Sequence, residues 1–249
     1  MQDKSTLEDA LALMRDLRTR CEWDRAQTHE SLRPYLIEET HELDDALRTG
    51  DVASMREELG DVLLQVLFHS VLAEEAGAFD AHDVAAGLIE KMKRRHPHLY
   101  GGGPREPWET MKARSRTSLT EGLPSGLPAL HRAQRLQDRA AGVGFDWPDT
   151  EGPALKVEEE LAEVREHLST SSGDTAALEE ELGDLLFAVV NLCRRAGVHA
   201  AVALDKANLK FERRFAAMES LAAAEGVPLE GRSLASLDKL WDSVKSAGG

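Results

Sequence analysis

The sequence has only two cysteines in 249 residues, Cys21 and Cys193. So few thiols exclude the disulfide framework on which small secreted domains rely. Residues 1–14 (MQDKSTLEDALALM) mix acids with apolar residues and lack the basic start and continuous apolar run of a signal peptide. No apolar stretch approaches the ~20 residues of a membrane-spanning helix. The sequence therefore predicts a protein of the reducing cytoplasm that binds no membrane.

Positive charge is also scarce. Lysine and arginine together number 30 against 45 acidic residues, for a formal net charge of −15. This balance argues against electrostatic binding to long nucleic acids. Small phosphorylated substrates remain compatible with it, because a bound metal and a few local bases can reverse the field of an acidic site.

Strand-like alternation is rare along the chain, and apolar residues recur at helical spacing instead, so we expect an all-α fold. The most informative stretch is 157–193, which reads VEEELAEVREHL, a polar joint at 169–174, and then LEEELGDLLFAVVNLC. Glu160 and Glu163 are three residues apart, and Glu181 and Asp184 repeat that spacing. On helices, each pair lies on one face.

A hairpin of antiparallel helices would bring these two acidic pairs face to face. Four converging carboxylates repel one another unless a cation lies among them, and Mg²⁺ prefers oxygen ligands. The alternative is that the acids are solvated surface residues. The uninterrupted apolar segment 185–190 favours a site, because a helix that is apolar all round is expected to be buried.

The same pattern occurs earlier in the chain. Glu39 and Glu42 form the first pair, residues 49–51 break the helix, and Glu58 and Asp61 form the second pair before the largely apolar stretch 62–72. A repeat of this length predicts two related helical units. We expect a first unit at 1–98, a linker rich in glycine and proline at 99–128, and a second unit at 129–249.

Six segments together resemble the MazG-type nucleoside triphosphate pyrophosphohydrolases in their two-domain form. They are CEWDRAQTHESLRPYLIEETHEL, REELGDVLLQVLFH, RRHPHLYGG, RAAGVGFDW, EEELGDLLFAVVNL and KANLKFERRF. The resemblance covers essentially the whole chain. It implies tandem helical bundles, dimerisation, dependence on Mg²⁺ or Mn²⁺, and hydrolysis of NTPs and dNTPs to the monophosphate and pyrophosphate.

The residues then take specific expected roles. The expected metal ligands are Glu160, Glu163, Glu181 and Asp184, and Glu159 or Glu180 is expected to orient or deprotonate the attacking water. Lys210 and Arg214 lie one helical turn apart and are expected to hold phosphate oxygens, unless they only complement the helix dipole. By resemblance, Trp241 and Lys245 lie near the nucleotide. Asn191 either contacts the sugar or base or is a buried polar residue of the core.

The second unit is the expected main catalytic unit. Phe68 occupies the position in the first unit that corresponds to Asn191, and no partner for Trp241 or Lys245 is evident there. The first unit keeps its four acids, so a second metal site or weak activity remains open. The family often has a lysine ahead of the second acidic pair, where this chain has Ala176 and Ala177. The resemblance therefore gives less support for a phosphate contact at that point of this chain.

Two other classes of protein remain as alternatives. A di-iron carboxylate bundle uses glutamates with an ExxH motif, and Glu38 and His41 form one, but the second unit has none. A non-catalytic all-α interaction protein would have solvated acids. The sequence leaves open the preferred base and sugar, and whether the role is clearance of damaged nucleotides, control of dUTP or control of alarmones.

Overall fold

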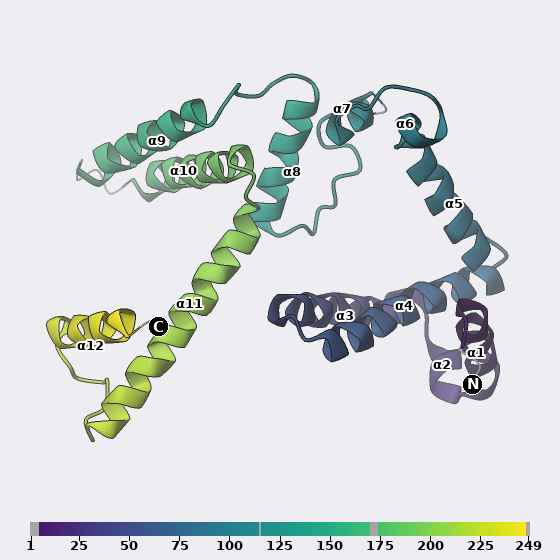
Figure 1. Cartoon of the computed structure of the whole chain (residues 1–249), viewed down its shortest axis with the longest axis horizontal. Helices are drawn as coiled ribbons and strands as arrows, with labels where there is room; N and C mark the ends of the chain where they lie inside the picture. The colour runs from purple at the N-terminus through teal and green to yellow at the C-terminus, as the bar shows by residue number, and fades with distance from the viewer. Residues whose placement is uncertain (1–4, 115, 170–173, 248–249) are drawn as a thin grey trace. The chain divides into compact units, whose positions relative to one another are not determined.

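The computed structural model describes residues 5–114, 116–169 and 174–247. The chain forms two compact units, residues 1–105 and 106–249. Within the described residues there are twelve helices and no strand, which confirms the all-α prediction (Figure 1). The first unit contains α1 (Leu7–Arg20), α2 (Glu22–Ala26), α3 (His29–Thr49), α4 (Val52–Glu75), α5 (Ala81–Arg94) and α6 (Pro97–Tyr100). The second contains α7 (Trp108–Ala113), α8 (Ala129–Gly142), α9 (Glu151–Ser169), α10 (Thr175–Arg195), α11 (Ala200–Ala224) and α12 (Leu234–Ser246).

The centre of the first unit is the hairpin of α3 and α4. Gly50 ends α3 with a φ of 73°, a left-handed conformation that favours glycine, and the side chain of Asp51 caps the start of α4. The α1 helix packs on α4 and closes a core of buried apolar side chains. Burial of each such side chain contributes about 1.5–3 kcal/mol. The core consists of Leu11, Met14, Leu32, Phe68 and Val71.

The chain is helical well before Pro34. Residues Glu22–Ala26 are helical, and α3 already begins at His29. The reason is local: Thr28 and Ser31 form a reciprocal capping box that satisfies the first free amides of α3. Pro34 therefore lies inside α3, close to its start, where it interrupts little of the hydrogen-bond ladder.

The second unit repeats the hairpin with α9 and α10, which lie side by side in Figure 1. Asp174 caps α10 by accepting hydrogen bonds from the Ala176 and Ala177 amides. The rest of the predicted joint, residues 170–173, lies outside the described residues. The α8 helix packs against α10 and α11, and α12 packs against α11 around Met218, Leu240 and Val244.

The predicted burial of the apolar segment 185–190 is wrong for the single chain. Ala188 and Val190 are buried, but Leu186, Phe187 and Val189 are 60%, 44% and 38% exposed. The physical reason is that α9 and α8 cover only part of the circumference of α10. An apolar stripe on α10 is therefore left open.

Part of the segment expected to be a linker folds onto the second unit. The α7 helix packs on α8, where Glu109 forms ion pairs with Arg135 at 2.9 Å and Arg116 at 3.2 Å. The boundary between the two compact units falls between residues 105 and 106, inside that segment.

Within the described ranges, no single helix has the length and hydropathy of a membrane span. The pair formed by α10 and α11, bent by 102° at the break between them, meets the same criteria of length and composition.

Candidate functional site

The second hairpin brings three of the four predicted metal ligands together. Glu160 and Glu163 on α9 and Glu181 on α10 each offer a carboxylate oxygen, and these oxygens all lie within 4.8 Å of one another. Glu160 is only 4% exposed. Burial and the nearby Glu160 charge raise the pKa of the Glu163 carboxyl. Asp184 lies one helical turn beyond Glu181, is exposed and is outside this group.

Two further side chains join this acidic cluster. Lys156 Nζ lies 2.6 Å from Glu160 Oε1 and 2.8 Å from Glu159 Oε1, and these contacts, with Glu159 first, raise the lysine pKa. His167 Nε2 lies 3.6 Å from Glu181 Oε1. The sequence prediction did not include Lys156 or His167. Their spacing along α9 is a usable signal, because residues 156, 160, 163 and 167 form one helical stripe.

The donor set of the cluster fits a hard divalent cation. It consists of carboxylate oxygens only, the ligand type that Mg²⁺ and Mn²⁺ accept readily. The Lys156 ammonium adds positive charge beside Glu160. Glu159 is 57% exposed at its side chain, and Glu180 is exposed next to Glu181. Both therefore border the cluster, and their role toward water stays a prediction.

The first hairpin contains a corresponding group. Glu39, Glu58 and Asp61 each offer an oxygen within 4.8 Å of the other two, and Glu42 is outside the group. Burial and Asp61 raise the pKa of Glu39, and burial and Glu42 raise that of Glu58. The position that corresponds to Lys156, four residues before the first acid, is Tyr35. A lysine four residues before the first acid is therefore a feature of the second unit.

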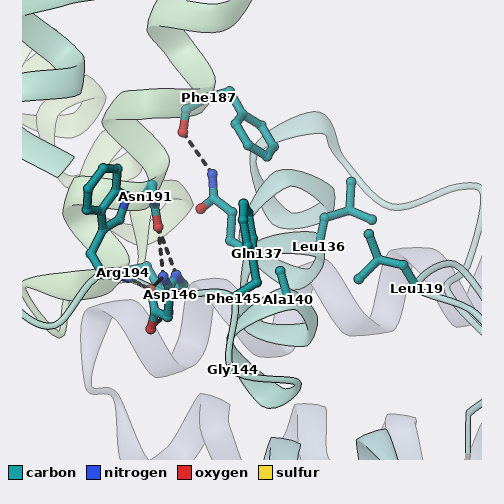
Figure 2. Close-up of a pocket in the computed structure, with 11 residues that line it drawn as sticks. Leu119, Leu136, Gln137, Ala140, Gly144, Phe145, Asp146, Phe187, Asn191 and Arg194 are labelled. Carbon is teal, nitrogen blue, oxygen red and sulfur yellow. Dashed lines mark hydrogen bonds and ion pairs between the residues drawn. The ribbon is translucent and has the colours of Figure 1, made fainter. Parts of the chain in front are cut away.

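A cavity of about 600 Å³ opens between α8, α10 and the turn that connects α8 to α9. Gln137 on α8 is 6% exposed, and its Nε2 donates to the Phe187 carbonyl at 2.8 Å. Its Oε1 is buried and has no hydrogen-bond partner within the described residues. In the view of Figure 2, the apolar residues Leu119 and Leu136 lie on one side of this amide. The complete lining is Leu119, Leu136, Gln137, Ala140, Gly144, Phe145, Asp146, Trp147, Phe187, Asn191 and Arg194.

The polar end of this cavity is an ordered network. Asn191 Oδ1 accepts hydrogen bonds from Arg194 Nε at 3.1 Å and Nη2 at 2.8 Å, drawn as dashed lines in Figure 2. Arg194 also pairs with Asp146, which lowers the pKa of that carboxyl. With its oxygen held by Arg194, the Asn191 amide keeps its Nδ2 hydrogens for another partner.

The cavity and the acids are linked along α10. Asp184, Phe187 and Asn191 are spaced i, i+3 and i+7 and therefore share one face. The helical rise puts Asn191 about 10 Å along the axis from Asp184. A carboxylate cluster and a cavity with aromatic walls thus follow one another on the same surface.

The predicted phosphate and nucleotide contacts on the last two helices form a separate group. The Arg214 guanidinium carbon lies 5.8 Å from the centre of the Trp241 ring, and Phe211 packs on the same ring at 5.4 Å. Lys210 and Lys245 are exposed. The α12 helix packs on the C-terminal half of α11, whereas α10 meets its N-terminal end (Figure 1). Within one chain, the structure does not bring these residues into the acidic cluster.

Comparison with known proteins identifies the family. The family model described as the MazG nucleotide pyrophosphohydrolase domain matches residues 27–100 and 151–217, so each match contains one acidic hairpin. The chain is 44% identical over 245 residues to the nucleoside triphosphate pyrophosphohydrolase of Escherichia coli (strain K12), covering 93% of both chains. It is 46% identical over 247 residues to the nucleoside triphosphate pyrophosphohydrolase/pyrophosphatase MazG of Thermotoga maritima, covering 96% of this chain and 95% of that protein. The chain therefore belongs to the MazG family of nucleotide pyrophosphohydrolases.

Proposed function

We propose that the second unit is the principal catalytic unit of a Mg²⁺-dependent enzyme that converts NTPs or dNTPs to the monophosphate and pyrophosphate. Membership of the family makes the chain a hydrolase of nucleoside triphosphates. The assignment to the second unit is supported by one observation above all. The converging carboxylates of Glu160, Glu163 and Glu181 lie on the same hairpin as a cavity large enough for a nucleoside.

The acidic cluster is proposed to hold the metal, with Glu160, Glu163 and Glu181 as ligands and Asp184 completing the set. A bound divalent ion neutralises triphosphate charge and lowers the pKa of an attacking water. Glu159 or Glu180 orients that water and accepts its proton. Water attack breaks the α–β phosphoanhydride bond, and the two products are a nucleoside monophosphate and pyrophosphate.

Lys156 is proposed to change partners when substrate and metal bind. In the structure it pairs with Glu159 and Glu160 and is 43% exposed at its side chain, so it can reach solvent from the cluster. A divalent ion held by these carboxylates would supply their counter-charge, and the Lys156 ammonium would then be able to contact a phosphate oxygen. Lys156 thus supplies a positively charged side chain close to the site. It takes over from the lysine that the family often has ahead of the second acidic pair, where this chain has Ala176 and Ala177.

The cavity along α10 is proposed to hold the nucleoside. Phe145, Trp147 and Phe187 supply aromatic rings against which a base can stack. Asn191, whose oxygen is held by Arg194, donates a hydrogen bond to the base or sugar. The spacing of about 10 Å between Asp184 and Asn191 matches a nucleotide whose phosphates lie on the acids.

A homodimer is proposed because the single chain leaves apolar helix faces uncovered. Within the described part of the chain, no residue of α5 is buried, and its apolar side chains Leu88, Ile89 and Met92 are 52%, 55% and 39% exposed. In the second unit, Leu186 and Phe211 are 60% and 56% exposed. Surfaces of this kind mark association sites. In such a dimer, Lys210, Arg214, Trp241 and Lys245 of one copy would approach the nucleotide held by the other.

The alternatives have less support. His167 contacts Glu181, but it follows Glu163 by four residues and so forms no ExxH motif with it, and neither three-carboxylate group found among the described residues includes a histidine, which disfavours a di-iron centre of the ExxH type. A non-catalytic interaction protein is also less well supported. Such a protein has no need for carboxylates that converge around a lysine and lie beside a cavity. The cytoplasmic location stays a prediction.

The experiment that tests the proposed function is product analysis by ion-exchange chromatography. The purified chain is incubated with a panel of NTPs and dNTPs, once with Mg²⁺ and once with excess chelator. We expect monophosphate and pyrophosphate with Mg²⁺ and no product with chelator. Diphosphate and phosphate would contradict the proposed reaction, and equal turnover with chelator would contradict the metal site.

A further inference from the structure

The cavity of the second unit takes most of its wall from residues outside the segments that match the family domain. Phe187, Asn191 and Arg194 lie within the matched segment 151–217. The other lining residues lie between positions 119 and 147, outside both matched segments. The shape of this wall is therefore set by packing that the domain match does not describe.

Among the described lining residues, Leu119 alone comes from the stretch of chain between α7 and α8. Figure 2 shows it beside Leu136, at the end of the cavity away from Asn191. Leu119 is 46% exposed, so its side chain is accessible to a molecule in the cavity. An aliphatic side chain offers no hydrogen bond and discriminates between ligands by their size and shape.

The turn that carries Leu119 is closed by its own hydrogen bonds. The Glu121 carboxylate accepts hydrogen bonds from the amide and the hydroxyl of Thr117. The Ser118 hydroxyl oxygen accepts one from the Glu121 amide at 3.2 Å. The backbone on either side of Leu119 is therefore tied together, which limits the positions that its side chain can take.

Arg139 fastens this turn to α8. Its Nη1 donates to the Leu119 carbonyl at 2.7 Å and to the Glu121 carbonyl at 2.9 Å. The arginine is only 6% exposed, so both hydrogen bonds are shielded from water. One guanidinium thus sets the position of Leu119 relative to the cavity residues of α8, which include Leu136.

The other end of the turn is anchored to α7. Arg116 donates to the Glu109 carboxylate on α7, and Arg135 on α8 donates to the same carboxylate. Gly142 lets the two helices come close, because a Cβ at this position would lie 2.9 Å from the Glu109 backbone oxygen. The turn is held at both ends, and Leu119 is therefore a fixed part of the cavity wall.

The two ends of the cavity differ in chemistry. Asn191 and Arg194 form the polar end, whereas Leu119, Leu136 and Ala140 are apolar. A base that meets Asn191 along one edge extends with its opposite edge toward the apolar end. A purine is longer than a pyrimidine by one fused ring and comes closer to Leu119.

We propose that Leu119 is a specificity-determining residue, which limits the size of the base that the cavity accepts, and that Arg139 is the positioning residue that holds it there. This inference rests on the proposed function, to which it adds a criterion for choosing between substrates. Arg139 acts through the backbone of the turn and touches no substrate.

The test measures kcat/KM for pyrophosphate release from ATP, GTP, CTP and UTP with Mg²⁺. Leu119→Ala lengthens the cavity and Leu119→Phe shortens it, and both should fold because the side chain is partly exposed. Arg139→Met removes the donor to the turn. Arg132→Met is the matched control, since it makes the same change on α8 at a residue that does not line the cavity. Circular dichroism and the melting temperature check folding.

We expect the purine-to-pyrimidine ratio of kcat/KM to rise at least about fivefold in Leu119→Ala and to fall by a similar factor in Leu119→Phe. One methylene in an enclosed apolar pocket is worth about 10–200-fold, and the smaller figure allows for a wall that is partly open to solvent. Arg139→Met should move the ratio in the same direction as Leu119→Ala, with KM more affected than kcat. Arg132→Met should keep the wild-type ratio.

The outcomes separate this inference from the proposed function. Pyrophosphate release with unchanged ratios in both Leu119 variants, or with ratios that move in the same direction, would overturn the inference and leave the proposed function intact. An equal loss for purines and pyrimidines in folded Arg139→Met would overturn the positioning role of Arg139. Diphosphate as the wild-type product would contradict the proposed function, and the inference would fall with it.

Discussion

Replacing Glu181 by glutamine should change stability and activity in opposite directions. Its carboxylate lies within 4.8 Å of that of buried Glu160, and at an effective dielectric constant of 20 the repulsion of two charges at this distance is about 3.5 kcal/mol. Lys156 beside Glu160 and His167 beside Glu181 offset much of it. We therefore expect Glu181→Gln to stabilise the metal-free chain by about 1 kcal/mol, or about 2–4 °C in melting temperature.

The same substitution should reduce turnover by at least about 100-fold, because a neutral amide replaces a metal ligand, and even second-layer substitutions around metals cost about 10–100-fold. The assay pairs thermal unfolding in chelator with steady-state pyrophosphate release in Mg²⁺. Glu179→Gln is the matched control, since it makes the same charge change at an exposed position of α10. Its melting temperature and turnover should stay close to those of the wild type.

Either half of this prediction can fail. Wild-type turnover by a folded Glu181→Gln variant would refute the metal role of Glu181. A loss of stability in chelator would mean that the contact with His167 outweighs the repulsion within the cluster.

Three further perturbations test other parts of the site. Lys156→Met should destabilise the metal-free chain by about 1 kcal/mol, because Glu160 loses its counter-charge; this value is already discounted for the exposure of the lysine. Added Mg²⁺ should bring the melting temperature of the variant closer to that of the wild type. A difference in melting temperature that Mg²⁺ leaves unchanged would contradict this reasoning. Glu163→Gln should become more stable than the wild type in chelator as pH rises above about 4.3. The raised pKa means that the folded wild type holds the Glu163 proton more tightly than the unfolded chain, so the wild type loses stability as this carboxyl ionises. Glutamine does not ionise and escapes this loss. Melting curves at about pH 4 and pH 7 check this sign, and a difference that shrinks toward neutral pH would refute it. Leu186→Glu should weaken the proposed dimer, because it places a charge on an exposed apolar face. Light scattering after size exclusion would show the dissociation as a lower molar mass. A wild-type protein with the mass of a monomer would refute the dimer.

Local spacing explains why the fold and the carboxylate groups could be predicted. The i, i+3 spacing of Glu160 and Glu163 is a property of any helix, and the polar joint before α10 is enough to imply a hairpin. The repeat of the same order around Glu39 and Glu58 made the prediction of two helical units firmer still. Each of these features depends on residues close together in the chain.

The cavity could not be predicted, because it depends on packing between distant residues. Gln137 on α8 meets the Phe187 carbonyl on α10, fifty residues further along the chain. Its sequence neighbourhood is an ordinary amphipathic helix. The burial of the Gln65 Oε1 atom without a partner among the described residues could not be predicted either, since a glutamine within an apolar stretch gives no sign of whether its oxygen will find a partner.

The exposure of Leu186 has a different explanation. An apolar stretch in a helix indicates that something covers it, but does not distinguish the same chain from a second copy. The prediction of burial within one chain was therefore wrong, although the apolar pattern behind it is present on α10. In the same way, the sequence does not distinguish whether Trp241 and Arg214 serve the carboxylates of their own chain or those of a second copy.

The assignment of catalysis to the second hairpin is tested by the same substitution at the aligned position of each hairpin. Phosphorus NMR follows the products of one NTP in Mg²⁺ for wild type, Glu181→Gln and Glu58→Gln, with circular dichroism to confirm folding. We predict monophosphate and pyrophosphate from wild type and from Glu58→Gln, and almost none from Glu181→Gln. Loss of product from Glu58→Gln with full turnover by Glu181→Gln would contradict the account and assign the reaction to the first unit.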